Sequence, residues 1–133
     1  MSRSLGRFCL QIAGFVWALP WTLFGLSIGL VGLLSGGAGR CRWPTLEFHS
    51  GGVRWFLEHF PAEPMAMTLG HVILGRTEAA LDISREHELV HVRQFERWGP
   101  LMIPAYLGCS LVLRIAGKDP YRDNPFEREA YGN

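Results

Sequence analysis

The chain has 133 residues, with 13 lysines and arginines against 12 aspartates and glutamates, so its net charge is +1 at pH 7. This balance excludes recognition of nucleic acid by charge, and the length suffices for one compact domain plus an appendage. The three cysteines (Cys9, Cys41 and Cys109) form no C-x-x-C pair, so neither a disulfide framework nor a cysteine zinc site is predicted.

The first predicted element is a charge-free apolar segment. No charged residue occurs between Phe8 and Gly39, and about 20 apolar residues are enough to cross a bilayer. We therefore predict a membrane anchor at residues 1–39. A signal peptide is the alternative, but this apolar run is longer than a signal core, so we expect it to stay uncleaved. Pro20 predicts either a kink or a break that gives a re-entrant hairpin.

The location expected for this anchor is a bacterial inner membrane. Arginine outnumbers lysine twelve to one, and GC-rich bacterial genomes produce such usage. Basic residues flank both ends of the apolar segment, which leaves open the side of the membrane that carries the rest of the chain.

Strand patterns follow the apolar segment. Thr45–His49 and residues 53–56 flank Ser50-Gly51-Gly52, which predicts a β-hairpin. Residues 65–74 predict a further strand with a kink at Gly70. We therefore expect an α+β fold in which a short antiparallel sheet of three or four strands precedes a helix.

The pentapeptide His87-Glu88-Leu89-Val90-His91 has the pattern H-E-x-x-H. On a helix its two histidines lie on one face, four residues apart, where they are able to hold one zinc ion. Glu88 then lies beside the metal, in a position to take a proton from a zinc-bound water. The alternative is an ordinary amphipathic helix that carries two unrelated histidines.

The ends of this helix are predicted from capping signals. Asp82 or Ser84 is expected to cap its start, because a short side-chain oxygen accepts from the free amides of the first turn. The helix then runs over residues 85–98. Gly99-Pro100 ends it, since glycine suits a left-handed cap and proline cannot continue the helix.

A second uncharged run covers residues 98–113. It is short for a membrane span and is interrupted by Pro104. A single crossing here would also separate His87 and His91 from any ligand that follows the run. We therefore predict a helix that packs in the core or lies at the membrane interface.

A third ligand is expected because catalytic zinc typically has three protein ligands and one open position. Asn124 followed by Pro125 predicts the start of another helix, with Glu127 in its first turn. Glu96 lies on the same helix as the histidines and cannot fold back onto their ion. Glu127 is therefore the preferred third ligand, and the alternative is a capping-box glutamate that bonds the Asn124 amide.

These two segments, His87-Glu88-x-x-His91 and Phe126-Glu127-Arg128-Glu129-Ala130, together resemble the gluzincin metallopeptidases, whose third ligand is a downstream glutamate. Residues 66–75 resemble the strand that precedes the motif in small gluzincin-like domains of the DUF4157 type. Gln94 fits their H-E-x-x-H-x-x-Q form. The resemblance covers about residues 65–131, half of the chain, and implies a zincin domain, which we place at residues 40–133.

One position departs from the gluzincin pattern. Tyr131 stands where many gluzincins have an aspartate that orients a histidine, so either Asp119 or Asp123 is expected to orient that histidine or its orientation is weaker. The chemistry also requires a donor to the oxyanion, and the candidates are His71, Tyr121 and Tyr131.

The function predicted from these residues is zinc-dependent endopeptidase activity near a bilayer, on a peptide or unstructured protein. Thr68, Leu69 and Gly70 are the expected edge strand that pairs with the substrate backbone. One alternative is an inactive pseudo-peptidase that serves as a membrane-associated binding or scaffold protein. Another is a haem protein, but histidines four residues apart on one helix cannot supply both axial ligands. The oligomeric state is left open.

Overall fold

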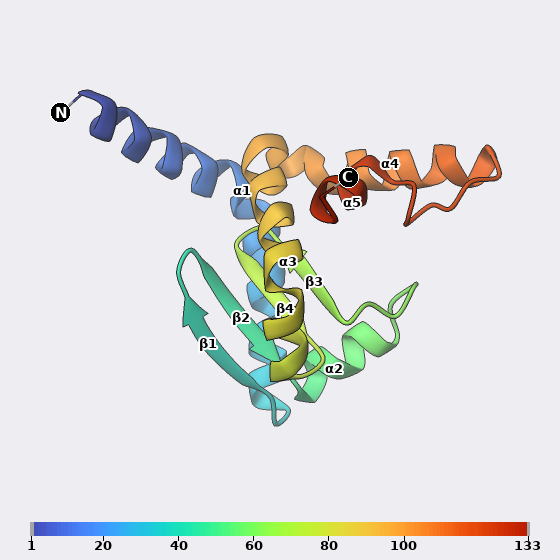
Figure 1. Ribbon diagram of the computed structural model, residues 1–133. Coiled ribbons are helices and arrows are strands. Elements are labelled where there is room, and N and C mark those ends of the chain that lie inside the picture. The colour runs from blue at the N-terminus through green and yellow to red at the C-terminus, as the bar shows by residue number, and fades with distance from the viewer. Residues whose placement is uncertain (1, 133) are drawn as a thin grey trace.

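The computed structural model describes residues 2–132 and has an α+β fold (Figure 1). Its elements, in chain order, are α1 (Ser2–Leu34), β1 (Ala38–Arg42), β2 (Thr45–His49), α2 (Gly51–Glu58), β3 (Ala66–Leu69), β4 (Val72–Gly75), α3 (Glu78–Trp98), the 3-10 turn η1 (Gly99–Leu101), α4 (Met102–Ile115) and α5 (Pro125–Ala130).

The four strands form one sheet in the order β1-β2-β4-β3, in which β2 and β4 run parallel and the two outer pairs are antiparallel. The prediction of a purely antiparallel sheet is therefore wrong. The predicted hairpin over residues 45–56 is also wrong, because α2 follows β2 directly. Val53 and Leu57, four residues apart, are fully buried on one face of α2, and this burial stabilises a helix there. The hairpin partner of β2 is β1.

Residues 65–74 form two strands rather than one kinked strand. Gly70 has a φ of 62° and lies in the turn between β3 and β4, where a Cβ atom would meet Thr22 of α1. The turn reverses the chain, so β3 becomes the edge strand and β4 lies inside the sheet. The expected edge strand therefore corresponds to β3.

The sheet lies between two helical layers. Ile73 of β4 packs with Leu81 and Val92 of α3 on one face. Its neighbours Val72 and Leu74 point to the other face, which α1 and α2 cover. Figure 1 shows α3 in front of the sheet and α1 behind it.

Helix α1 is continuous through Pro20, so the hairpin expected there does not form. Figure 1 shows the helix bending along its length, as an internal proline favours. Glycines let its second half approach the sheet: a Cβ at Gly29 would lie 2.5 Å from the Phe48 ring, and one at Gly32 would lie 2.5 Å from Val53. Residue 39 therefore marks a change in hydropathy, but α1, which precedes it, packs against the strands and helices that follow it.

Replacing Gly29 by valine is expected to destabilise the fold by about 1–3 kcal/mol, because the added atoms overpack the Phe48 ring. Gly6→Val is the matched control, since a Cβ at Gly6 meets nothing within 4 Å. Both glycines lie inside α1, so the change in helix propensity is similar. Thermal or denaturant unfolding measures the difference, and equal stability of the two variants would contradict the close packing.

Two helical stretches are long and apolar enough to cross a membrane, namely Arg3–Leu34 and Glu78–Ile115, although signal sequences and core helices also pass this test. Only 22% and 11% of their most apolar windows are buried. In α4 only Met102 is fully buried, while Leu107, Leu111 and Ile115 are exposed. Of the two placements expected for residues 98–113, packing in the core is therefore wrong for most of the run, and a place at the membrane interface stays a prediction.

Candidate metal centre

Helix α3, which carries the H-E-x-x-H motif, begins at Glu78, about two turns before the predicted start. Thr77 is its cap and accepts a hydrogen bond from the amide of Ala80. The capping roles predicted for Asp82 and Ser84 are wrong. The Asp82 carboxylate accepts from arginines of β1, and the Ser84 hydroxyl donates to a carbonyl one turn earlier. The predicted end is confirmed, because Gly99 has a φ of 56° and caps the helix.

His87, His91 and Glu127 bring one ligand atom each to a common point, all within 4.8 Å of one another. The two Nε2 atoms are 3.2 Å apart, and Glu127 Oε1 lies 3.2 Å from His87 Nε2 and 2.6 Å from His91 Nε2. Tetrahedral bonds of 2.0–2.1 Å require ligand atoms roughly 3.3 Å apart. Two of the three separations match this value, so the donors fit a single zinc-sized ion.

Helix α5 carries Glu127 to this point. Asn124 caps the helix, as predicted, by accepting from the amide of Phe126. Its side-chain amide donates to the Tyr106 carbonyl and to the Ser110 hydroxyl, both on α4. The capping-box alternative does not form, since the Asn124 amide donates to the Tyr121 carbonyl. The chain therefore returns along α4 after leaving it, and Figure 1 shows α5 beside α4.

Glu127 of α5 and His91 of α3 shift each other's pKa. Burial works to raise the pKa of Glu127, but hydrogen bonds from His87 and His91 outweigh it and hold the pKa at about 2. Burial also works to lower the pKa of His91, but the bond and charge of Glu127 outweigh it and raise that pKa. Glu127 is thus a carboxylate at neutral pH, as a metal ligand must be.

Glu88 is only 5% exposed and lies beside the ligand group. The hydroxyl of Thr68, on β3, is 3.0 Å from its Oε1 atom and 3.2 Å from its main-chain oxygen, so it is able to donate to either. Burial raises the pKa of Glu88, and the nearby histidines and Thr68 offset this only in part. A raised pKa suits a group that has to accept a proton and release it again.

Gln94 orients one of the histidines. Its Oε1 atom is 2.8 Å from His91 Nδ1, which donates to it, so the ring is held with Nε2 directed at Glu127 and His87. The Gln94 amide nitrogen donates to the Phe126 carbonyl and to Glu129. Glu129 is therefore turned away from the histidines and also bonds Arg97.

His87, unlike His91, has no hydrogen bond that orients its ring through Nδ1. Its Nδ1 atom is buried and has no hydrogen-bond partner among the described residues. The Tyr131 ring lies against the imidazole instead, with centroids 4.3 Å apart. Asp123 accepts from the Asp119 amide in the loop before α5, and neither aspartate bonds a histidine of the ligand group. The expectation that one of these aspartates orients a histidine is therefore wrong.

Replacing Tyr131 by aspartate is expected to raise the zinc affinity, because the carboxylate would accept from His87 Nδ1. Such outer-shell bonds are worth about 10- to 100-fold in metal affinity. Tyr131→Phe keeps the ring beside His87 and is expected to leave the affinity unchanged. Competition with a chromophoric chelator measures the zinc affinity of the wild type and of both variants. An unchanged or lower affinity for Tyr131→Asp would contradict the view that His87 Nδ1 lacks an acceptor.

The remaining predicted residues lie in two places. His71 is buried in the β3–β4 turn, stacked on Phe15 of α1, with Nε2 3.3 Å from Glu96, and it is not part of the ligand group. The Tyr121 hydroxyl, by contrast, is 3.1 Å from the Tyr131 hydroxyl, next to His87. The tyrosines therefore remain oxyanion candidates by position, whereas His71 supports the packing of α1.

Sequence reasoning missed Tyr106 on α4. Its hydroxyl donates to Glu127 Oε2 at 3.3 Å, whereas the histidines lie at Oε1, so Tyr106 orients the third ligand through its other oxygen. The sequence feature that could have indicated this role is the polar hydroxyl of a tyrosine within the uncharged run of residues 98–113.

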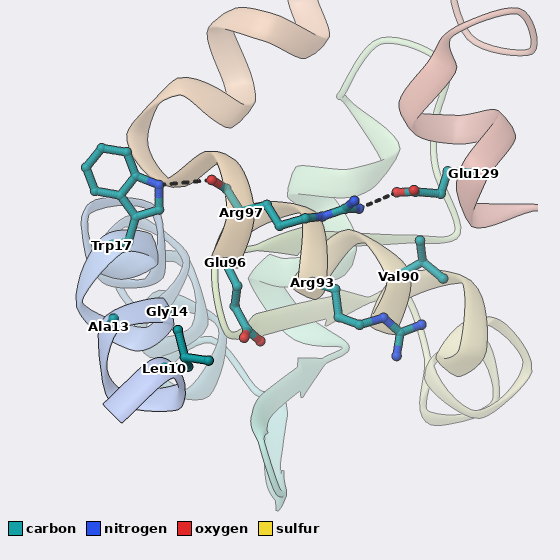
Figure 2. Close-up of a pocket in the computed structure, with 9 residues that line it drawn as sticks. All are labelled: Leu10, Ala13, Gly14, Trp17, Val90, Arg93, Glu96, Arg97 and Glu129. Atoms are coloured by element: carbon teal, nitrogen blue, oxygen red, sulfur yellow. Dashed lines mark hydrogen bonds and ion pairs between the residues drawn. The ribbon is translucent and has the colours of Figure 1, made fainter. Parts of the chain in front are cut away.

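A groove of about 920 Å³ lies along the outer face of α3, between α1 and α5 (Figure 2). Its lining is Leu10, Ala13, Gly14, Trp17, Val90, Arg93, Glu96, Arg97 and Glu129. None of the three ligand residues lines it, so the volume of this groove says nothing about the metal site.

Comparison with protein-family models, with curated proteins and with solved structures finds no significant match to this chain.

Proposed function

We propose that this protein is a membrane-associated zinc metalloendopeptidase of the gluzincin type. The observation that carries the proposal is the convergence of His87, His91 and Glu127 on one point, with the buried carboxylate of Glu88 beside it. Two nitrogens and one carboxylate oxygen are a common ligand set of catalytic zinc. The two Nε2 atoms lie only 3.2 Å apart, which does not suit axial ligands on opposite faces of a haem.

The residues divide the chemistry among them. When bound, zinc lowers the pKa of a water molecule and polarises the carbonyl of the scissile peptide. Glu88 accepts the proton of the attacking water and delivers it to the leaving amine, while Thr68 holds the carboxylate in place. Tyr121 and Tyr131, which lie next to His87, are the proposed donors to the developing oxyanion, while the Tyr106 hydroxyl is engaged with Glu127.

The proposed substrate is an extended peptide that pairs with the free edge of β3. The main-chain amide of Arg76 donates to the Met65 carbonyl, so these two residues form a hydrogen-bonded pair. Along an antiparallel ladder such pairs alternate with pairs whose main-chain groups point away from the partner strand. Ala66 and Thr68 therefore direct their main-chain groups to the free edge, next to Glu88. Leu69 pairs inward with Val72, and Gly70 packs on α1. Of the expected edge residues, Thr68 is thus the strongest candidate for contact with the substrate.

Cleavage of an unstructured peptide pool by the purified protein, followed by mass spectrometry, tests the proposal. Activity is expected to disappear on chelation and to return with zinc. Bound zinc without cleavage would favour the pseudo-peptidase, a second candidate that the unsupported Nδ1 atom of His87 favours. A protein that binds neither zinc nor another divalent ion would contradict the peptidase and leave the pseudo-peptidase only as a metal-free scaffold.

A further inference from the structure

Helix α1 has two different faces along its whole length. One face carries Arg3, Arg7 and Gln11 and continues into the small residues that pack on the sheet and α3. The opposite face holds large apolar residues that are between 44% and 89% exposed. They are Leu5, Ile12, Val16, Leu19, Leu23, Leu30 and Leu34. We call this set the outer stripe.

The packed half of α1 excludes a transmembrane orientation for this fold. From Gly14 to Gly32 the helix lies against the domain over about 27 Å, close to the roughly 30 Å of a hydrocarbon core. Charged groups of the domain lie beside both ends of this stretch. A Cβ at Gly14 would be 3.0 Å from the Glu96 carboxylate, and Gly32 packs on Val53 of α2, which bears the exposed Arg54–Glu58 ion pair. Charges at the ends alone would lie at the two membrane interfaces, but α3 also packs against α1, and a crossing would carry its exposed Glu86 and Arg93 into the hydrocarbon core, at high cost.

The unpacked part of α1 is too short to cross by itself. Residues 3–13 span about 16 Å, roughly half of the hydrocarbon core. Neither the packed nor the free half of α1 therefore provides a crossing, although the segment has the length and composition of a membrane span.

We infer that α1 lies in the plane of the membrane surface, with the outer stripe in one leaflet, so that the protein is monotopic. The partner of the stripe is a lipid bilayer with anionic headgroups. Arg3 and Arg7 form no ion pair within residues 2–132, and both lie at the N-terminal end of α1 on the face opposite the stripe, where the basic side chains of a helix lying in the membrane surface meet lipid phosphates. The inference rests on the proposed membrane location, not on hydrolysis, so failure of zinc binding or cleavage leaves it standing.

The sidedness of two cysteines tests the orientation. Gly6→Cys adds a thiol at a position with open space, and Cys41 is a native exposed thiol in β1, after the helix. With Cys9 and Cys109 changed to alanine, a membrane-impermeant maleimide is applied to sealed vesicles of phosphatidylethanolamine and phosphatidylglycerol. Both thiols are expected to react from the same side. Reaction from opposite sides would overturn the inference in favour of a spanning helix.

The depth of the stripe is tested with an environment-sensitive fluorophore on Leu23→Cys, in a background without native cysteines. Ile83→Cys on α3 is the matched control, because Ile83 is also a highly exposed apolar residue but lies on the polar domain. Vesicles are expected to shift the emission at position 23 to the blue and to leave position 83 unchanged. No shift, or a shift that appears without lipid and grows with protein concentration, would overturn the inference; the latter assigns the stripe to a second copy.

Discussion

Replacing Glu88 by glutamine is expected to abolish hydrolysis while zinc binding and the fold remain. The amide has nearly the shape of the carboxylate, and its oxygen still accepts from the Thr68 hydroxyl. It cannot take a proton from water, however, and removal of a general base costs about 10²- to 10⁴-fold in rate. Glu88 is no metal ligand in this arrangement, so the metal content should match that of the wild type.

The measurement pairs the rate of peptide cleavage with metal analysis of the same preparation. Glu86→Gln is the matched control, because Glu86 lies two residues earlier on α3 with its side chain exposed to solvent. It makes the same chemical change outside the site, and cleavage should continue at the wild-type rate. If the Glu88 variant also cleaved at that rate, another group would have to be the base, and the proposed mechanism would fail.

Replacing Glu127 by alanine is expected to cost the protein most of its zinc affinity. The carboxylate is the one ligand that does not come from α3, and its loss leaves two histidines with no third donor. The effect should exceed the 10- to 100-fold that the loss of an outer-shell partner typically costs. Helix α5 should persist, because the Asn124 cap and its bonds to α4 do not involve Glu127.

Glu129→Ala is the control, on the same helix. Glu129 bonds Gln94 and Arg97 and reaches the metal site only through Gln94, so its removal should cost far less affinity. Zinc titration against a chelator compares the two variants, and the thermal unfolding of the metal-free proteins reports whether the fold is kept. Equal affinities for the two would remove Glu127 from the ligand set and leave an ordinary histidine–glutamate ion pair in its place.

The parts of the site that depend on local geometry were predictable from the sequence. Four-residue spacing places His87 and His91 on one face of a helix whatever the rest of the chain does, and the structure has their ring nitrogens 3.2 Å apart. The start of α5 was equally local, because an asparagine cap followed by proline is a signal read over a few residues.

The tertiary structure decided what depends on contacts between distant segments. The parallel pairing of β2 and β4 and the burial of Val53 and Leu57 turned a hairpin pattern into a strand and a helix, because short apolar runs suit either element.

The tertiary structure likewise decided which residue orients Glu127 and how α1 packs. Tyr106 reaches Glu127 only because Asn124 ties α5 to α4, and no spacing in the sequence encodes that contact. By length and composition α1 could cross a membrane, yet its glycines fit the ring of Phe48 and the side chains of Val53 and Val72, so that the domain covers one face. Hydropathy determines that such a helix avoids water, but only packing decides which of its faces the domain covers.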